Sequence, residues 1–216
     1  MQKIMFSDKF GLTQAVIDGR KTMTRRIMNI DPLRTIVVQS FDKEGNLRGK
    51  ISTDYGNFGR LIINSRYKIG EVVAVAQTYK DVISLLPADE NNVLSGNFAW
   101  AAFGMSRGKG YKNKMFVRAD LMPYQIKITN IRVERLQDIS DDDCFKEGIR
   151  YCGESHESSP SFPTLGFDDF ERKVFCNYAT AREAFAVLID KINGKGTWDR
   201  NPWVLVYDFE LKKYNV

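Results

Sequence analysis

The sequence predicts an α+β protein, because it contains both clear strand patterns and clear helix patterns. Over residues 203–211 every second side chain is apolar, so that one face of a strand there is fully apolar: Trp203, Leu205, Tyr207, Phe209 and Leu211. Residues 180–193 begin with Thr-Ala-Arg-Glu, which is typical of a helix capping box, and continue with an apolar stripe at helical spacing. The chain has 216 residues, a length that suits one compact domain with insertions.

Further strands are expected in the first two thirds of the chain. Residues 72–76 form an almost continuous apolar run, as in a strand buried on both faces. Residues 35–38 and 49–53 flank a polar, turn-forming stretch and predict an inserted hairpin. Residues 115–118 are another candidate strand.

A long strand is expected over residues 125–136. Its inward-facing positions change parity at Thr129 and Asn130. One extra residue in a β-bulge exchanges the two faces of a strand, so the sequence predicts a bulge here.

Two shorter helices are indicated by their end signals. Residues 10–18 have helical spacing, and Gly19 suits the left-handed position that follows a helix. Ser140 precedes three aspartates, which are favourable in the first turn of a helix. Gly148 can end that helix, and this places Glu147 in its last turn.

Charge and cysteine content restrict the class of protein. Lysine and arginine total 32 against 27 acidic residues, an excess that permits a polyanionic partner but is too small for a dedicated nucleic-acid coat protein. The three cysteines, Cys144, Cys152 and Cys176, have no paired spacing and favour free thiols in a reducing, cytoplasmic setting. No signal peptide or membrane-spanning run is visible in the sequence, so no membrane association is expected.

The most informative segment is Gly19-Arg20-Lys21-Thr22-Met23-Thr24-Arg25-Arg26. It resembles the Gly-x-Lys-x-x-Thr-x-Arg signature of the ASCH family, a PUA-like group of small barrels associated with RNA, and it matches at all four defined positions. The resemblance implies a mixed or antiparallel β-barrel of about five or six strands with flanking helices. The whole chain, 1–216, is then one domain with insertions at about 30–66, 82–113 and 150–177. Similar ASCH proteins are encoded by phages and gut bacteria.

The resemblance also implies an activity. Some small bacterial ASCH proteins are amidohydrolases that remove the acetyl group of N4-acetylcytidine with a lysine, a threonine and a glutamate. Lys21 and Thr24 match the first two by motif, and Glu147 matches the third by its place after the long strand. No cofactor is implied.

These residue types can together hydrolyse an amide. The Thr24 hydroxyl is the nucleophile, a neutral Lys21 takes its proton, and Glu147 returns a proton to the leaving amine. Lys21 needs a lowered pKa for this role, which burial or nearby cations can cause. Arg20, Arg25 and Arg26 are placed to lower it and to bind a ligand.

Alternatives remain open at these positions. A basic stretch after a helix C-terminus can simply complement the helix dipole and face solvent. Glu147 can be an ordinary surface carboxylate that pairs with Lys146 or Arg150.

Binding of RNA or a modified nucleoside is the function predicted first, because it demands least of the same pocket: nothing must be deprotonated. Amide hydrolysis is the alternative. Arg107, Lys109, Tyr111 and Lys112 are candidate nucleic-acid contacts, although such residues more often form an ordinary solvated loop. A phage or host interaction protein without catalysis is a third hypothesis. A buried Lys21 within hydrogen-bond reach of Thr24 favours the enzyme, whereas a wide basic groove with an exposed Lys21 favours RNA.

No metal site is expected from the sequence. His156 is the single histidine, and Cys152-x-x-x-His156 lacks a second pair of ligands. No Ser-His-Asp arrangement is suggested either, because His156 lies in a polar stretch without an evident partner.

Overall fold

The centre of the fold is a mixed five-stranded sheet with the strand order β1-β6-β7-β11-β2. The computed structural model describes residues 1–41, 47–52, 57–85, 104–151, 165–168 and 175–213. β1 pairs with β6 in parallel, and the other neighbours are antiparallel. The strands of this sheet are β1 (Lys3–Ile4), β2 (Met23–Ile27), β6 (Val72–Val75), β7 (Tyr124–Arg135) and β11 (Trp203–Lys213).

This sheet is open within the described residues, with β1 at one edge and β2 at the other. A side chain spans the gap between the edges: the Arg26 guanidinium donates a hydrogen bond to the Met5 carbonyl, at 2.8 Å. The predicted α+β class is therefore confirmed. No closed barrel is found in the described part of the chain, and the PUA-like barrel stays a prediction.

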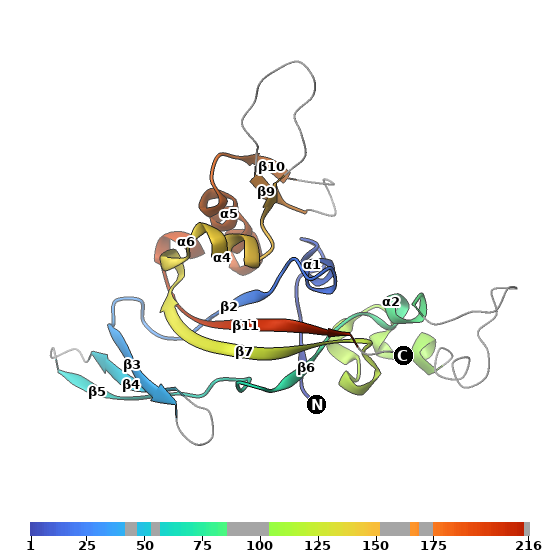
Figure 1. Cartoon of the computed structure of the whole chain (residues 1–216), viewed down its shortest axis with the longest axis horizontal. Helices are drawn as coiled ribbons and strands as arrows, with labels where there is room; N and C mark the ends of the chain where they lie inside the picture. The colour runs from blue at the N-terminus through green and yellow to red at the C-terminus, as the bar shows by residue number, and fades with distance from the viewer. Residues whose placement is uncertain (42–46, 53–56, 86–103, 152–164, 169–174, 214–216) are drawn as a thin grey trace, which may run out of the picture.

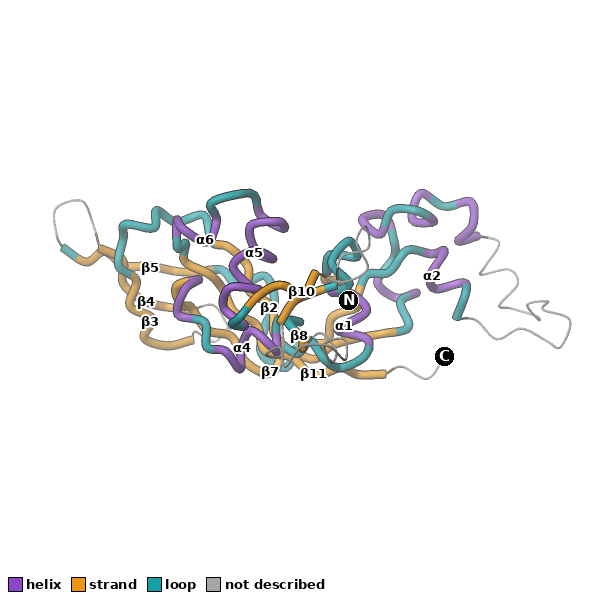
Figure 2. Tube along the Cα trace, turned by 90° about the horizontal axis from the view of Figure 1, so that it is seen from above, coloured by secondary structure: helices purple, strands orange, loops and turns teal. Residues whose placement is uncertain are grey.

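The region predicted as the first insertion forms a sheet of its own at one end of the molecule (Figures 1 and 2). The predicted hairpin is confirmed as two antiparallel strands, and a third strand extends it. These strands are β3 (Ile36–Phe41), β4 (Leu47–Ser52) and β5 (Phe58–Ile63). A third small sheet occupies the last predicted insertion and consists of β8 (Arg150–Tyr151), β9 (Leu165–Phe167) and β10 (Phe175–Tyr178).

The opposite end of the molecule contains α2 (Tyr79–Ile83) and a series of 3₁₀ turns around a small second core (Figure 1). The strand predicted over 115–118 is wrong, because residues Lys114–Phe116 form one of these turns. The Asn113 side chain accepts a hydrogen bond from the Met115 amide and so stabilises the turn locally.

Most of the remaining helices lie on one side of the five-stranded sheet, next to β2 (Figure 1). The predicted caps are confirmed: Ser140 accepts from the Asp143 amide, and Thr180 forms a capping box with Glu183. The helices are α1 (Leu12–Ile17), α4 (Asp141–Lys146), α5 (Ala181–Asn193) and α6 (Thr197–Arg200). None of the described helices combines the length and the apolar character needed to cross a bilayer.

The long pair β7–β11 carries the main core and the predicted bulge. Asp208 faces Asn130, whereas the next residue, Phe209, faces Ile128, so Thr129 is the extra residue. The bulge lets the apolar positions on both sides of it, Ile128 and Ile131, reach the interior, where both are buried.

Candidate active site

The signature segment lies where the chain passes from α1 into the edge strand β2. Gly19 adopts the left-handed conformation, with φ of 75°, and reverses the chain after α1. The Lys21 amide then donates to the Ala15 carbonyl at 2.9 Å, and the Thr22 amide donates to the Lys146 carbonyl at 3.0 Å. These bonds fix Lys21 between the C-terminal ends of α1 and α4.

Lys21 is buried, with 2% of its surface exposed. Its Nζ donates to the Glu147 carboxylate Oε2 at 2.5 Å and to the carbonyl oxygen of the same residue at 2.7 Å. Burial lowers the pKa of Lys21, Glu147 opposes this change, and the charges of Arg26 and Arg25 add to it. The Lys21 pKa is thus shifted in the direction expected from the sequence, and of the two expected causes burial has a larger effect than the neighbouring arginines.

Glu147 follows α4 directly as its C-terminal cap. The next residue, Gly148, has φ of 108°, and a Cβ there would lie 3.1 Å from the Leu12 side chain. A glycine is therefore required for the Glu147 carbonyl to approach Lys21. Glu147 is buried, so the surface ion pair with Lys146 or Arg150 considered above is not formed.

Arg25 holds the other side of the Glu147 carboxylate. Its guanidinium lies 3.2 Å from Glu147, 3.1 Å from Asp143 and 2.5 Å from Glu134, and its side chain is 1% exposed. Burial acts against the charge of Arg25, but Glu147 and Glu134 outweigh it and raise the pKa. Arg132 pairs with Glu134 and Asp143 in turn, at 2.9 and 2.7 Å. These contacts favour a positioning role for Arg25 over the ligand-binding role expected from the sequence.

Thr24 and Arg26 alternate with Arg25 along β2 and so lie on its other face. The Thr24 side chain is buried and, among the described residues, its hydroxyl makes no hydrogen bond, so the contact between Lys21 and Thr24 that would favour an enzyme is not formed as a hydrogen bond. The Phe6 ring lies 5.8 Å from the Lys21 Nζ and 5.7 Å from the Arg26 guanidinium carbon. A small pocket of about 80 Å³ is lined by Lys21, Thr24, Arg25, Arg26 and Glu147 together with Phe6 and residues of α5.

Not every residue selected from the sequence reaches this pocket. Arg20 is exposed and pairs with Asp18 and Asp168, at 3.2 and 3.7 Å. The segment with Arg107, Lys109, Tyr111 and Lys112 lies near α2 and lines neither this pocket nor the larger one described next. Lys109 instead lies over the Phe116 ring, at 6.0 Å.

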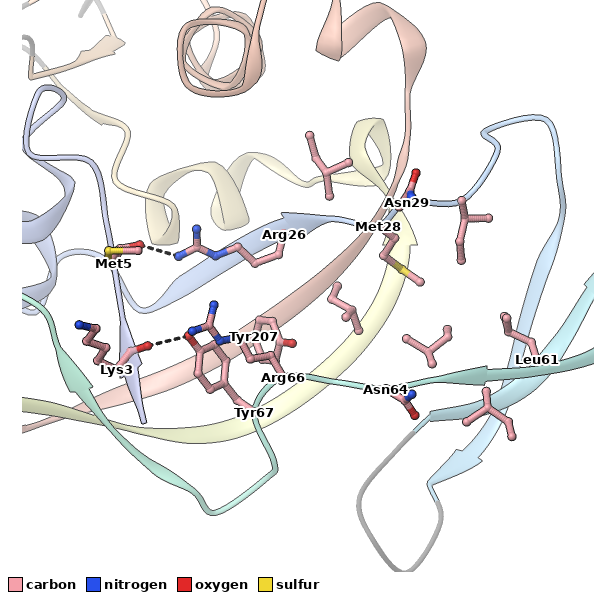
Figure 3. A pocket seen from close by; sticks show the side chains of 15 residues that line it. Lys3, Met5, Arg26, Met28, Asn29, Leu61, Asn64, Arg66, Tyr67 and Tyr207 are labelled. Carbon is pink, nitrogen blue, oxygen red and sulfur yellow. Dashed lines mark hydrogen bonds between the residues drawn. The ribbon is translucent and has the colours of Figure 1, made fainter. Parts of the chain in front are cut away.

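A larger pocket of about 550 Å³ adjoins the small one, and the two share Met5, Arg26 and Ile27 in their linings (Figure 3). Sequence reasoning missed this pocket, because it combines residues distant in sequence such as Arg66, Tyr67 and Tyr207. It also missed the carboxylates around Arg25. The local pattern of β2 gave no signal for them, because Glu134, Asp143 and Glu147 come from distant parts of the sequence.

No group of side chains able to hold a metal ion occurs in the described residues. Cys152 and His156 lie outside them. Comparisons of the chain with protein-family models, curated proteins and solved structures gave no match.

Proposed function

We propose that the chain is an ASCH-type protein of PUA-like architecture that hydrolyses the amide of an N-acylated nucleoside such as N4-acetylcytidine. The observation that carries this proposal is the burial of Lys21 against Glu147 in a pocket that also contains the Thr24 hydroxyl. A basic stretch that served only solubility or the helix dipole would leave Lys21 in water with an ordinary pKa.

The hydrogen bonds of Lys21 suit a general base. Two of its three Nζ positions point to the carbonyl and the carboxylate of Glu147. A neutral amine donates its two hydrogens in those directions and keeps its lone pair for the proton of a nucleophile. Desolvation favours the neutral form, and this is the direction in which the Lys21 pKa is shifted.

The reaction then proceeds in two halves. Thr24 Oγ attacks the acyl carbonyl while its proton passes to Lys21, and the C–N bond breaks as a proton reaches the leaving amine through Glu147. Water next attacks the acyl-Thr24 ester, with Lys21 again taking the proton, and releases the carboxylic acid. Arg26 or a backbone amide is available to stabilise the oxyanion.

The size of the small pocket agrees with an acyl group as its occupant. A volume of about 80 Å³ is well below the ~300–1,000 Å³ typical of whole small-molecule sites. The nucleoside part must therefore lie outside it, and the adjoining larger pocket is the available space.

The test is to incubate the purified protein with N4-acetylcytidine and to follow cytidine formation by chromatography. We expect turnover that Thr24→Ala and Lys21→Met abolish. Thr22→Ala is the matched control, since Thr22 is in the same segment but lines neither pocket. All variants should show unchanged circular dichroism. Equal turnover by wild type and Thr24→Ala would contradict the proposal.

Binding of a nucleoside or RNA without hydrolysis is the second candidate. It is favoured by the 2.5 Å contact between Lys21 Nζ and the Glu147 carboxylate, which a purely structural ion pair also forms. Folded protein that binds cytidine but releases none from N4-acetylcytidine would select this candidate, and RNA titration across a salt series would follow.

A further inference from the structure

The larger pocket has the properties of a ligand site in its own right. Its volume of about 550 Å³ is within the ~300–1,000 Å³ range of small-molecule sites. Its floor contains the buried rings of Tyr67 and Tyr207, which meet edge to face at 5.4 Å. The exposed amides of Asn29 and Asn64 lie on its rim, on different segments of the chain (Figure 3).

The pocket is positively charged. Arg26 and Arg66 line it, and no aspartate or glutamate occurs among its described lining residues. The two guanidinium groups lie close enough for the charge of one to act on the other (Figure 3). Lys3 also belongs to the lining, but its ammonium donates to the carbonyls of Met115 and Val117 and is directed to them.

Neither arginine is neutralised within the part of the chain that the structure describes. Arg26 donates to the Met5 carbonyl, and Arg66 lies over the Tyr67 ring at 5.5 Å, but no carboxylate pairs with either. The neighbouring Arg25, in contrast, contacts three carboxylates. Two unneutralised guanidinium groups in one recess match an oxyanion, and a phosphate offers the fork geometry that guanidinium groups prefer.

We propose that this pocket binds the phosphate and the sugar of a nucleoside monophosphate, so that the substrate is an N-acylated nucleotide and not a free nucleoside. This inference rests on the proposed function for the placement of the acyl group beside Thr24. Arg26 lines both pockets and therefore lies where the two parts of such a substrate join.

The segment predicted as an insertion, residues 30–66, builds one wall of the pocket. Leu61, Ile62, Ile63 and Asn64 come from the end of β5 and the residue after it. This segment thus converts the edge of the five-stranded sheet into a recess with a second wall. A recess of this volume has room for about one nucleotide, whereas a continuous RNA strand needs a groove that extends over several.

The test separates binding from catalysis. Isothermal titration of cytidine and of cytidine 5′-monophosphate into Thr24→Ala protein needs no turnover. We expect the monophosphate to bind about 10- to 100-fold tighter, as charge-assisted hydrogen bonds to a phosphate provide. Arg66→Gln in the same background should remove this preference. Arg60→Gln, an exposed arginine on β5 that does not line the pocket, is the matched control and should retain it.

Each outcome bears on one proposal. Equal affinity for the nucleoside and the monophosphate, or a preference that survives in Arg66→Gln, would overturn the phosphate site. An RNA oligonucleotide with only internal cytidines that bound tighter than the monophosphate would also overturn the proposal, because the natural ligand would then be RNA and not a mononucleotide. An Arg66-dependent preference without any hydrolysis would leave the phosphate site standing and remove the proposed activity. Turnover of N4-acetylcytidine without a phosphate preference would support the proposed activity and remove the phosphate site.

Discussion

Glu147→Gln is the perturbation for which the structure makes the sharpest prediction. Within the described residues, Glu147 supplies both acceptors of the buried Lys21 ammonium, through its carboxylate and its own carbonyl. Arg25 would keep Glu134 and Asp143 after the substitution, but Lys21 would keep only neutral acceptors. The cost of the substitution should therefore fall almost entirely on Lys21.

The loss of folding free energy in Glu147→Gln has an upper limit. Removing one partner of a buried ion pair typically destabilises a protein by about 3–5 kcal/mol. Lys21 can escape this cost by losing its proton, and from an ordinary pKa of 10.5 this requires at most about 5 kcal/mol at pH 7. This upper limit decreases by about 1.4 kcal/mol for each unit of increase in pH, because Lys21 loses its proton more easily. At pH 9 the substitution should cost about 2 kcal/mol or less.

Lys21→Met should cost less than Glu147→Gln, about 1–3 kcal/mol, because Glu147 keeps Arg25 as a partner. The double variant should be more stable than Glu147→Gln alone, since it contains no unpaired buried ammonium. Urea unfolding of the four proteins at pH 7 and pH 9 measures these free energies. Additive costs, or a cost of Glu147→Gln that does not change with pH, would refute the reasoning.

Other expectations concern the neighbours of this pair. The rate constant kcat/KM should rise with pH through a pKa below 10.5, because burial lowers the pKa of Lys21 and only its neutral form accepts a proton; a flat profile would exclude Lys21 as the base. Gly148→Ala should destabilise the fold by about 1–3 kcal/mol and by more than Gly19→Ala, since only the former also meets a side chain; urea midpoints decide this. Cys144 is buried, and desolvation raises its thiol pKa to about 12, so in Cys152→Ser/Cys176→Ser protein it should react with iodoacetamide only after unfolding; rapid native labelling would contradict its burial.

The parts of the fold that the sequence predicted correctly depend on local signals. The helix after Ser140 and the helix after Thr180 are specified by a cap and by a few residues that follow it. The bulge at Thr129 appears as a change of parity within one strand. Each of these signals is complete within about ten residues, so no knowledge of distant segments is required.

The strand β2 was not predicted, and the reason is physical. Its residues, Met23–Ile27, include three consecutive polar positions, of which Arg25 is buried. An arginine can occupy an inward position only because Glu134, Asp143 and Glu147 surround it. Those acids come from β7 and α4, more than a hundred residues away in sequence, and local periodicity contains no trace of them.

The candidate site could be predicted only in part for the same reason. The segment Gly19–Arg26 suggested Lys21 and Thr24, the order of elements suggested Glu147, and all three line the small pocket. The larger pocket depends on where β5 and β11 approach β2, and a single sequence does not specify that approach. The alternation of residues 203–211 places Tyr207 on the apolar face of its strand, and this is correct. Its contact with Tyr67 in a pocket with two arginines depends on tertiary structure.

The buried ionic cluster at β2 costs free energy of desolvation. Lys21, Arg25 and their carboxylates must be desolvated, and replacing such buried pairs by apolar side chains of similar volume is often neutral or even stabilising. Stability alone therefore does not explain them, whereas a pocket that must hold a lysine close to neutrality beside a threonine does. This explanation requires stability and activity to separate in Lys21→Met/Glu147→Leu protein. That protein should unfold at a urea concentration close to that of the wild type and should release no cytidine from N4-acetylcytidine. Full turnover would mean that the buried pair has no part in the chemistry.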